Sequence, residues 1–199
     1  MVSKGELNRY IKQHLSETRY QHTMGVVKVA KELAEINHVS PEKAEIAALC
    51  HDIAKNLTID QMKKIIKEQK IELSDDEKTS IEVWHAILAP VLAREDLEVY
   101  DVEILQSIRW HTTGKENMSI LDKIIYIADM IEPRREFKGV DEIREEAYKD
   151  LDKGVVMGID HTIEYLVERK SPIDINSVKA RNYIIKQYKK GKLRASKQV

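Results

Sequence analysis

The chain has 199 residues, of which 42% are hydrophobic and 34% are charged. This length suits one domain with a substantial core, and the composition is typical of a soluble globular protein. The 33 basic and 34 acidic residues leave a net charge of -1, which excludes a general electrostatic attraction to nucleic acid or to an anionic membrane. We therefore expect no membrane partner, and nucleic acid is disfavoured as a partner.

The cellular compartment is also constrained by the sequence. The single cysteine, Cys50, cannot form an intramolecular disulfide. No apolar run approaches the roughly 18 residues that cross a membrane, and the first nine residues lack the apolar segment of a secretion signal. These features predict a cytoplasmic protein.

Helix-favouring residues dominate the chain, and its seven glycines and four prolines are few for this length. Capping residues and apolar spacing then give the helix boundaries. A capping box of Ser3 and Glu6 opens the first expected helix, residues 3–15, and a second helix covers about 19–36. A third begins at residue 41 and runs into the stretch 49–55, and two short helices begin at Thr58 and Ser74. A segment from residue 84 has Pro90 at a kink or in its first turn, and the remaining helices are expected at 101–111, 119–130, 141–169 and 176–190. We predict a single all-α domain of eight or more helices.

The stretch 49–55 (LCHDIAK) places an imidazole beside a carboxylate in an apolar run. Neighbouring residues on a helix point about 100° apart, so His51 and Asp52 cannot both face solvent. An inward carboxylate needs a partner, because burying an unpaired charge is very costly. A metal ion would satisfy both side chains, although for the dipeptide alone an ordinary buried His–Asp hydrogen bond is the favoured explanation.

The seven histidines divide into two groups. His14, His38 and His161 have unremarkable surroundings, so we expect them to be exposed or simply packed. The other four each adjoin an apolar helical segment, and one carboxylate lies in a further apolar segment. These five segments carry His22, His51 with Asp52, His85, His111 and Asp129. Five apolar segments that each carry a metal-type side chain indicate a shared metal centre rather than five separate core residues.

The order of these residues resembles the metal-ligand pattern of the HD-domain phosphohydrolases, in the six-ligand version associated with two metal ions. Four longer segments are similar to the YqeK group of bacterial HD proteins: residues 19–26 (RYQHTMGV), 51–55 (HDIAK), 109–114 (RWHTTG) and 126–135 (YIADMIEPRR). The resemblance covers about residues 3–190 and implies symmetrical hydrolysis of diadenosine tetraphosphate to two ADP. It implies one HD-type domain over residues 1–199, with a metal-binding core at about 18–135, C-terminal helices at about 140–190 and a basic tail at 191–199.

Two divalent ions about 3.5–4 Å apart can activate a water and stabilise an in-line displacement at phosphorus. A carboxylate suits the bridging position because it has two oxygens, so we assign Asp52 as the bridge and as a catalytic residue. His22, His51 and Asp129 would complete one ion, and His85 and His111 the other. Ligands of nitrogen and oxygen without thiolate favour iron, with manganese, cobalt, nickel or magnesium as alternatives.

Phosphate also requires cations other than metals. Lys55 would share a face with His51 and Asp52 if the helix continues, and we expect it to bind substrate and stabilise charge during catalysis. The other expected phosphate contacts are Arg19, Thr112, Thr113, Arg134 and Arg135. Each of these residues also has an explanation without a substrate. Lys55 would neutralise the C-terminal end of a helix, the arginines would be solvated, and the threonines would mark the end of a helix. We interpret Trp84, Trp110 and Tyr126 as core residues, and Cys50 as a small buried residue.

Two other functions remain open. The first is another HD-class nucleotide phosphohydrolase, either a nucleoside monophosphatase or a hydrolase of guanosine alarmones, because a metal centre does not choose its substrate. The second is a non-catalytic nucleotide- or RNA-binding module. It is suggested by a basic C-terminus that contains Lys186, Lys189, Lys190, Lys192, Arg194 and Lys197. A homodimer is also left open.

Overall fold

The computed structural model describes residues 4–195, and side chains as far as residue 190. In this part of the chain there are eleven α-helices, one 3-10 helix and no strand, which confirms the all-α prediction. The elements are α1 (Lys4–His14), α2 (Glu17–Ile36), α3 (Pro41–Cys50), α4 (Ile59–Glu68), α5 (Asp75–Thr79), η1 (Ile81–Val83), α6 (Trp84–Leu97), α7 (Val102–Arg109), α8 (Ile120–Ile131), α9 (Val140–Lys149), α10 (Leu151–Glu168) and α11 (Ile175–Ala195).

The helix starts follow the local chemistry of the sequence. Thr58 with Gln61 and Ser74 with Glu77 form the predicted capping boxes, and side-chain oxygens also cap the helices that follow Ser40, Asp101 and Ser119. Each cap satisfies backbone N–H groups that have no partner within the helix. The capping box predicted at Ser3 lies outside the described residues.

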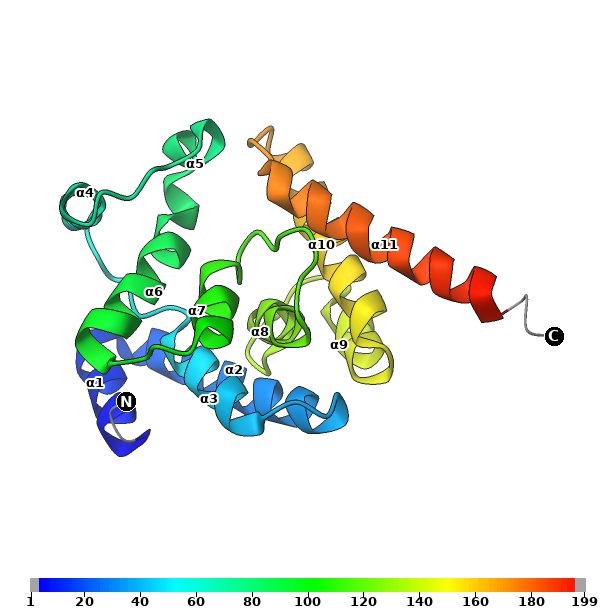
Figure 1. The fold of residues 1–199 in the computed structure, drawn as a ribbon, viewed down its shortest axis with the longest axis horizontal. Helices are drawn as coiled ribbons and strands as arrows, with labels where there is room; N and C mark the ends of the chain where they lie inside the picture. The colour runs from blue at the N-terminus through cyan, green and yellow to red at the C-terminus, as the bar shows by residue number, and fades with distance from the viewer. Residues whose placement is uncertain (1–3, 196–199) are drawn as a thin grey trace.

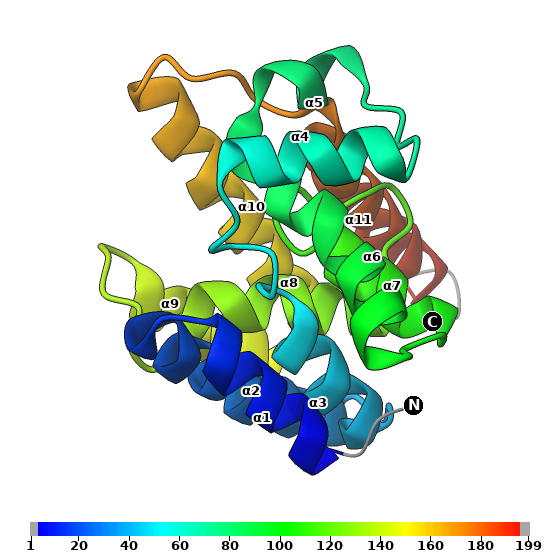
Figure 2. The ribbon, with the colours of Figure 1, turned by 90° about the vertical axis from the view of Figure 1, so that its left-hand side faces the viewer.

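Helix α8 lies in the middle of the other helices in both views (Figure 1, Figure 2). It contacts α2, α3, α7, α9 and α10, and Ile124, Ile125 and Ile127 on it are fully buried. Burial on several sides is what its apolar sequence favours. Helices α2, α3, α7 and α8 therefore hold fixed positions relative to one another, and these four carry or immediately precede most of the predicted metal ligands.

Three boundaries differ from the sequence prediction. Helix α3 ends at Cys50, and α7 ends at Arg109, so the residues that follow each of them lie in tight turns. The helix predicted over 141–169 is broken at Asp150, whose side chain accepts a hydrogen bond from the backbone of Lys153 and starts α10 as an N-cap. Pro90 lies inside α6 rather than in its first turn.

Helices α4, α5 and α11 lie at the periphery of the molecule (Figure 1). Helices α4 and α5 lie together at one end of α6, away from α1–α3, in both views (Figure 1, Figure 2). Helix α11 contacts α10 and extends away from the other helices toward the C-terminus (Figure 1). Within the described chain, none of the helices combines the length and the apolar character needed to cross a membrane.

Candidate metal centre

The structure brings the six predicted ligands together from five parts of the chain. His22 lies on α2, His51 and Asp52 follow α3, His85 lies in the first turn of α6, His111 follows α7, and Asp129 lies on α8. Except for the partly buried Asp129, all are buried. Because these elements pack against one another, the six side chains meet inside the protein.

Asp52 lies at the centre of this group. Its Oδ2 lies 3.5 Å from Nε2 of His51 and 3.9 Å from Nε2 of His22. Its Oδ1 lies 3.3 Å from Nε2 of His85 and 3.8 Å from Nε2 of His111. The two oxygens of one carboxylate therefore face two different pairs of histidines.

The histidine rings are oriented by hydrogen bonds on their far side. A backbone carbonyl can only accept, so a ring nitrogen bonded to it must carry the proton, and the other nitrogen of a neutral ring keeps its lone pair. Nδ1 of three rings donates in this way to the carbonyl three residues earlier: His51 to Ala48 at 2.6 Å, His85 to Glu82 at 2.7 Å and His111 to Ile108 at 2.7 Å. When the ring is neutral, each Nε2 therefore presents its lone pair on the side of Asp52.

The fourth ring, His22, is oriented by a carboxylate that the sequence alone does not reveal. Its Nδ1 lies 3.0 Å from Oε1 of Glu132, which is only 1% exposed. The second oxygen of Glu132 accepts a hydrogen bond from the backbone N–H of Arg134 at 2.8 Å. Glu132 stands three residues after Asp129, a spacing that places two residues on the same side of a helix, and this spacing is the signal by which it could be found.

The buried nitrogens fit a metal ion. Nε2 of His22 and Nε2 of His51 are buried without a hydrogen-bond partner among the described residues, which is costly unless a ligand satisfies them. His22, His51 and Asp129 form one group whose ligand atoms lie within 4.8 Å of one another, and His51, Asp52 and His111 form a second. This donor set suits a divalent transition metal.

Both carboxylates are held in the charged form that a metal requires. Burial raises the pKa of Asp52, but His51, His111 and His85 together outweigh burial and hold the pKa well below its usual value. The pKa of Asp129 is lowered for similar reasons, since burial is outweighed by the nearby imidazole of His22 together with the charge of Arg135. Each side chain can therefore act as an anionic ligand across the physiological pH range.

Two of the histidines are held neutral. Burial, with repulsion from neighbouring groups, lowers the pKa of His85 to about 3 and that of His111 to about 4. Burial also lowers the pKa of Lys55, whose Nζ lies 3.2 Å from Nε2 of His85. Although α3 does not continue to this lysine, the backbone N–H of Lys55 bonds to the carbonyl of Asp52 at 2.9 Å, and this turn keeps the lysine beside the ligands.

The predicted arginines surround the same group. Nη1 of Arg19 lies 2.8 Å from Oδ2 of Asp52, and Nη2 of Arg135 lies 2.7 Å from Oδ1 of Asp129. Arg134 is exposed. A shallow groove of about 340 Å³, which we call the arginine groove, is lined by Ser16, Thr18, Arg19, His22, Glu132, Arg134 and Arg135. Positive charge therefore adjoins the ligands on this side.

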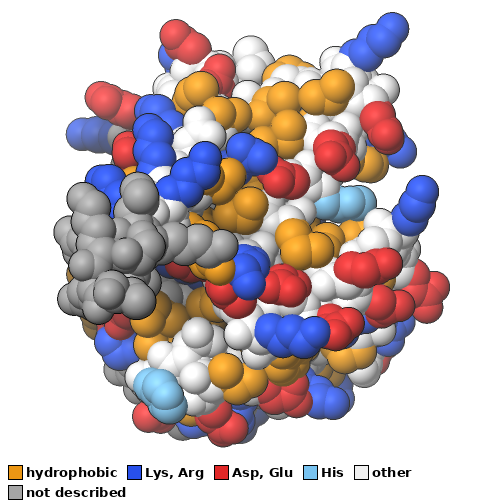
Figure 3. Space-filling view, turned by 90° about the vertical axis from the view of Figure 1, so that its right-hand side faces the viewer, with side chains coloured by type: hydrophobic (Ala, Val, Ile, Leu, Met, Phe, Trp, Pro, Cys, Tyr) orange, Lys and Arg blue, Asp and Glu red, His pale blue; other side chains and the backbone are white. Residues whose placement is uncertain are grey.

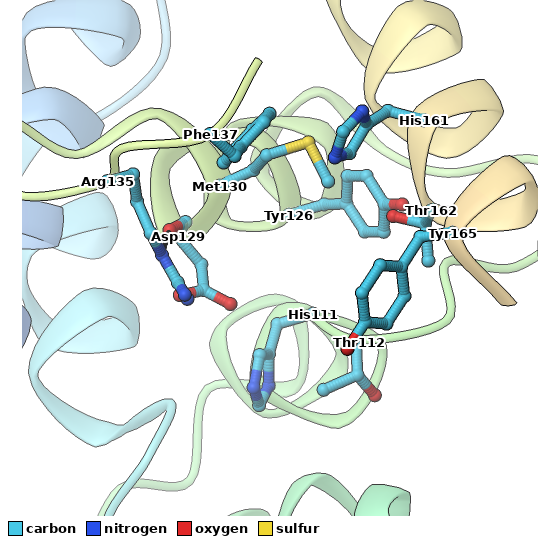
Figure 4. A pocket seen from close by; sticks show the side chains of 10 residues that line it. All are labelled: His111, Thr112, Tyr126, Asp129, Met130, Arg135, Phe137, His161, Thr162 and Tyr165. Atoms are coloured by element: carbon cyan, nitrogen blue, oxygen red, sulfur yellow. Dashed lines mark hydrogen bonds and ion pairs between the residues drawn. The ribbon is translucent and has the colours of Figure 1, made fainter. Parts of the chain in front are cut away.

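A second opening, which we call the aromatic cavity, adjoins other members of the ligand group. Its volume is about 340 Å³, and it is lined by His111, Thr112, Tyr126, Asp129, Met130, Arg135, Phe137, His161, Thr162 and Tyr165. Arg135 and Asp129 lie at one side of this opening, and His161, Thr162 and Tyr165 lie at the opposite side (Figure 4). His161 thus lines a cavity beside the ligands, which its charged sequence surroundings do not indicate.

The two predicted threonines are placed differently. Thr112 lines the aromatic cavity, and its hydroxyl oxygen is buried without a hydrogen-bond partner in the described part of the chain. Thr113 is buried, its hydroxyl donates to the carbonyl of Gly114 at 3.0 Å, and its own carbonyl accepts from Ser177. The structure therefore brings Thr112 to the cavity and does not bring Thr113 there.

Comparisons with known proteins agree with this architecture. The family described as "HD domain" matches residues 19–134. A protein of Halalkalibacterium halodurans is 37% identical over 94% of this chain and 100% of its own length, and one of Bacillus subtilis is 40% identical over 92% and 98%. Both are named "Bis(5'-nucleosyl)-tetraphosphatase, symmetrical".

A solved structure gives the same result. The crystal structure of a predicted HD superfamily hydrolase involved in NAD metabolism, from Clostridium acetobutylicum, matches with a TM-score of 0.90 and 41% identity. The match covers 94% of this chain and 99% of the other. The resemblance that the sequence motifs predict is confirmed: this chain belongs to the HD domain family, among relatives named as symmetrical bis(5'-nucleosyl)-tetraphosphatases.

Proposed function

We propose that this protein hydrolyses diadenosine tetraphosphate to two ADP at a centre of two divalent metal ions bridged by Asp52. The names of the relatives support the substrate. The single observation that carries the two-ion centre is the position of Asp52, whose two carboxylate oxygens face the pair His22 and His51 and the pair His85 and His111.

The proposed ligands are His22, His51 and Asp129 for one ion and His85 and His111 for the other, with Asp52 shared between them. When bound, two such ions lower the pKa of a water molecule and stabilise the negative charge that develops during displacement at phosphorus. Four imidazoles and two carboxylates without a thiolate support iron, and manganese, cobalt, nickel and magnesium are the alternatives.

The side chains of this chain supply the rest of the chemistry. Lys55 and Arg135 present positive charge to the phosphate oxygens, where it is most effective because the site is partly shielded from water. In the balanced reaction, the oxygen of one water bonds to one of the two central phosphorus atoms. The bond from that phosphorus to the bridging oxygen breaks, and ADP leaves with this oxygen.

The experiment combines metal analysis with product analysis. Protein purified without chelator should contain metal and convert diadenosine tetraphosphate to ADP alone, as resolved by chromatography. Asp52→Asn should lose metal and turnover together, because an amide is a poor bridge between two cations. The matched control is Asp60→Asn, which makes the same change at an exposed position on α4. Full turnover by Asp52→Asn would contradict the proposal.

The same product analysis separates the other HD-class activities. A nucleoside monophosphatase would release inorganic phosphate from AMP, and a guanosine alarmone hydrolase would release pyrophosphate from its own substrate. Either activity in place of ADP formation would replace our assignment. The cytoplasmic location, the division of the domain and a homodimer stay predictions.

The RNA-binding alternative receives little support from the described surface. Lys186, Lys189 and Lys190 are the described members of the basic C-terminus, while the side chains of Lys192, Arg194 and Lys197 lie outside the described residues. On the face shown in Figure 3, some basic side chains gather at the upper left, but acidic side chains lie among them and over the rest of the coloured face, so no wide area there is basic alone. A basic area of that kind is what phosphate-backbone binding requires.

A further inference from the structure

Two openings of unlike chemistry adjoin the metal-ligand group. The aromatic cavity contains the rings of Tyr126, Phe137, His161 and Tyr165, whereas the one ring that lines the arginine groove is that of the buried metal ligand His22. Arg135 lines both openings. A phosphate chain that crosses the metal centre would therefore pass Arg135 with a different environment at each end.

From this asymmetry we propose that the site recognises only one of the two nucleosides of its substrate by its base. One adenine enters the aromatic cavity, and the other half of the substrate lies along the arginine groove, where only its phosphates are bound. The proposal rests on the proposed function and adds to it which part of the substrate carries specificity. It makes His161 and Tyr165 residues that determine specificity.

The cavity is suited to a planar base. Its volume of about 340 Å³ lies within the range of small-molecule sites, roughly 300–1,000 Å³. The rings of Phe137 and His161 are stacked, with centroids 4.3 Å apart and an angle of 25° between their planes. Tyr165 lies across the opening and is 47% exposed. Bases stack on aromatic rings of this kind regardless of hydrogen-bond pattern.

The polar groups at the rim of the cavity fit the rest of a nucleotide. Asp129 and Arg135 lie at the side opposite His161 and Tyr165 (Figure 4), so a base beside those rings would direct its phosphates toward the metal ligands. The hydroxyl of Thr112, which has no partner among the described residues, is available to a polar atom of the nucleoside. An amino or ring nitrogen of a purine has the required chemistry.

The arginine groove offers charge instead of stacking surface. Arg19 and Arg134 line it together with the exposed hydroxyl-bearing residues Ser16 and Thr18. Guanidinium groups bind phosphate oxygens through two parallel hydrogen bonds. The one ring of this groove, that of His22, is buried in the metal-ligand group and offers little surface on which a second base could stack. Removing the second nucleoside should therefore cost little binding.

The test uses adenosine 5'-tetraphosphate, which keeps one nucleoside and the whole phosphate chain. Hydrolysis between the second and third phosphorus atoms adds one water: its oxygen bonds to the second phosphorus, the bond from that phosphorus to the bridging oxygen breaks, and pyrophosphate leaves. We expect ADP and pyrophosphate at a kcat/KM within about tenfold of that for diadenosine tetraphosphate. A loss of more than about a hundredfold, with diadenosine tetraphosphate still cleaved to two ADP, would overturn the inference and leave the proposed function intact.

Two variants test the assignment of the cavity. Tyr165→Ala and His161→Ala should each raise the KM for both substrates by about five- to hundredfold, the range expected for loss of one stacked base, and leave the bound metal unchanged. Tyr100→Ala removes a more exposed ring outside the cavity and should leave KM unchanged. Unchanged KM in both cavity variants would overturn the assignment. If wild-type protein fails to form ADP from diadenosine tetraphosphate, the proposed function fails instead.

A binding measurement gives an independent readout. Calorimetric titration of metal-loaded protein with ADP should find one strong site per chain, weakened in Tyr165→Ala. Two sites of equal affinity per chain would contradict recognition of a single base.

Discussion

The imidazole of His22 and the carboxylate of Glu132 lie 3.0 Å apart inside the protein, joined by a hydrogen bond at Nδ1. This contact leaves Nε2 of His22 directed toward Asp129, whose Oδ1 is also 3.0 Å away. A carboxylate that is hydrogen-bonded to the ring nitrogen away from the metal fixes the orientation of a metal-binding histidine and makes the other ring nitrogen a stronger ligand.

Removing this support should weaken metal binding without removing a ligand. We expect Glu132→Ala to reduce the affinity for the ion near His22 by about ten- to hundredfold, the usual effect of losing such a partner. Metal titration of the chelator-treated protein measures it. The control is Glu164→Ala on α10, which removes an exposed carboxylate. Equal metal affinity in Glu132→Ala and wild type would show that His22 needs no support.

The same contact can be disturbed from the opposite side. A methyl group at Gly25 would lie 2.5 Å from Oε2 of Glu132, which is too close for two non-bonded atoms, so Glu132 must shift. Gly25→Ala should therefore weaken metal binding although it alters neither a ligand nor a charge. Lys28→Ala, at an exposed position on the same helix, is the control and should bind metal normally. Wild-type metal affinity in Gly25→Ala would mean that Glu132 relaxes without disturbing His22.

Lys55 should act on turnover and not on metal content. Its ammonium group lies beside His85, 3.2 Å from Nε2, where it can stabilise charge on a phosphate. We expect Lys55→Gln to lower kcat on the order of a hundredfold, as loss of one electrostatic contact to a transition state commonly does. Lys64→Gln, on the exposed side of α4, should have no effect. Loss of metal in Lys55→Gln would assign the lysine a structural role.

The stability of the metal-free protein should depend on pH in a defined window. The pKa values of His85 and His111 are lowered by burial to about 3 and about 4, below the value of about 6.5 in an unfolded chain. Above about pH 6.5 both histidines are neutral in the folded and in the unfolded protein, so their contribution to the free energy of unfolding is fully present. As the pH falls below 6.5, the unfolded chain binds protons that the folded protein does not, so stability is lost down to about pH 4 to 3.

The expected slope is roughly 1.4 kcal/mol per pH unit for each of these histidines. Urea unfolding in the presence of chelator, at pH 7, 6 and 5, measures it, and His111→Gln should reduce the slope by about half. A free energy of unfolding that is constant between pH 7 and pH 5 would show that the two rings are not buried in the neutral form.

The close contact between α9 and α10 gives a prediction about stability alone. A methyl group at Gly154 would lie 2.4 Å from Cα of Ala147. Because Cα belongs to the backbone, this clash cannot be relieved by rotating a side chain. Gly154→Ala should lower the free energy of unfolding by about 1–3 kcal/mol, the usual cost of overpacking, despite the higher helix propensity of alanine. Lys179→Ala, at an exposed position on α11, is the control. An increase in stability would mean that the helices separate freely.

The sequence predicts much of this fold because its signals are local. The caps at Ser40, Thr58 and Ser119 act within three residues of where they stand, so no tertiary information is needed to recognise them. The break at Asp150 is of the same kind, and its aspartate is a good N-cap, but the apolar spacing on both sides resembles one continuous helix. The order of the ligands is equally visible, because each lies in an otherwise apolar segment.

The remaining parts of the site depend on tertiary contacts. Glu132 lies in the run EPRR, which resembles a solvated loop. Its spacing from Asp129 places it on the side of the ligands, but its burial beside His22 depends on the packing of α8 against α2. The aromatic cavity combines Phe137 from the loop before α9 with His161 and Tyr165 from α10. Sequence spacing cannot bring these residues beside Asp129, because their proximity depends on how α10 packs on α8.

The most direct test of the account is the position of the metal ions relative to Asp52. Anomalous diffraction from crystals grown without chelator, recorded on both sides of the iron absorption edge, locates the ions and identifies iron in one measurement. Our account predicts two ions about 3.5–4 Å apart, one beside each carboxylate oxygen of Asp52, with His22 and His51 at one ion and His85 and His111 at the other. A single ion, or two ions that do not share Asp52, would contradict it.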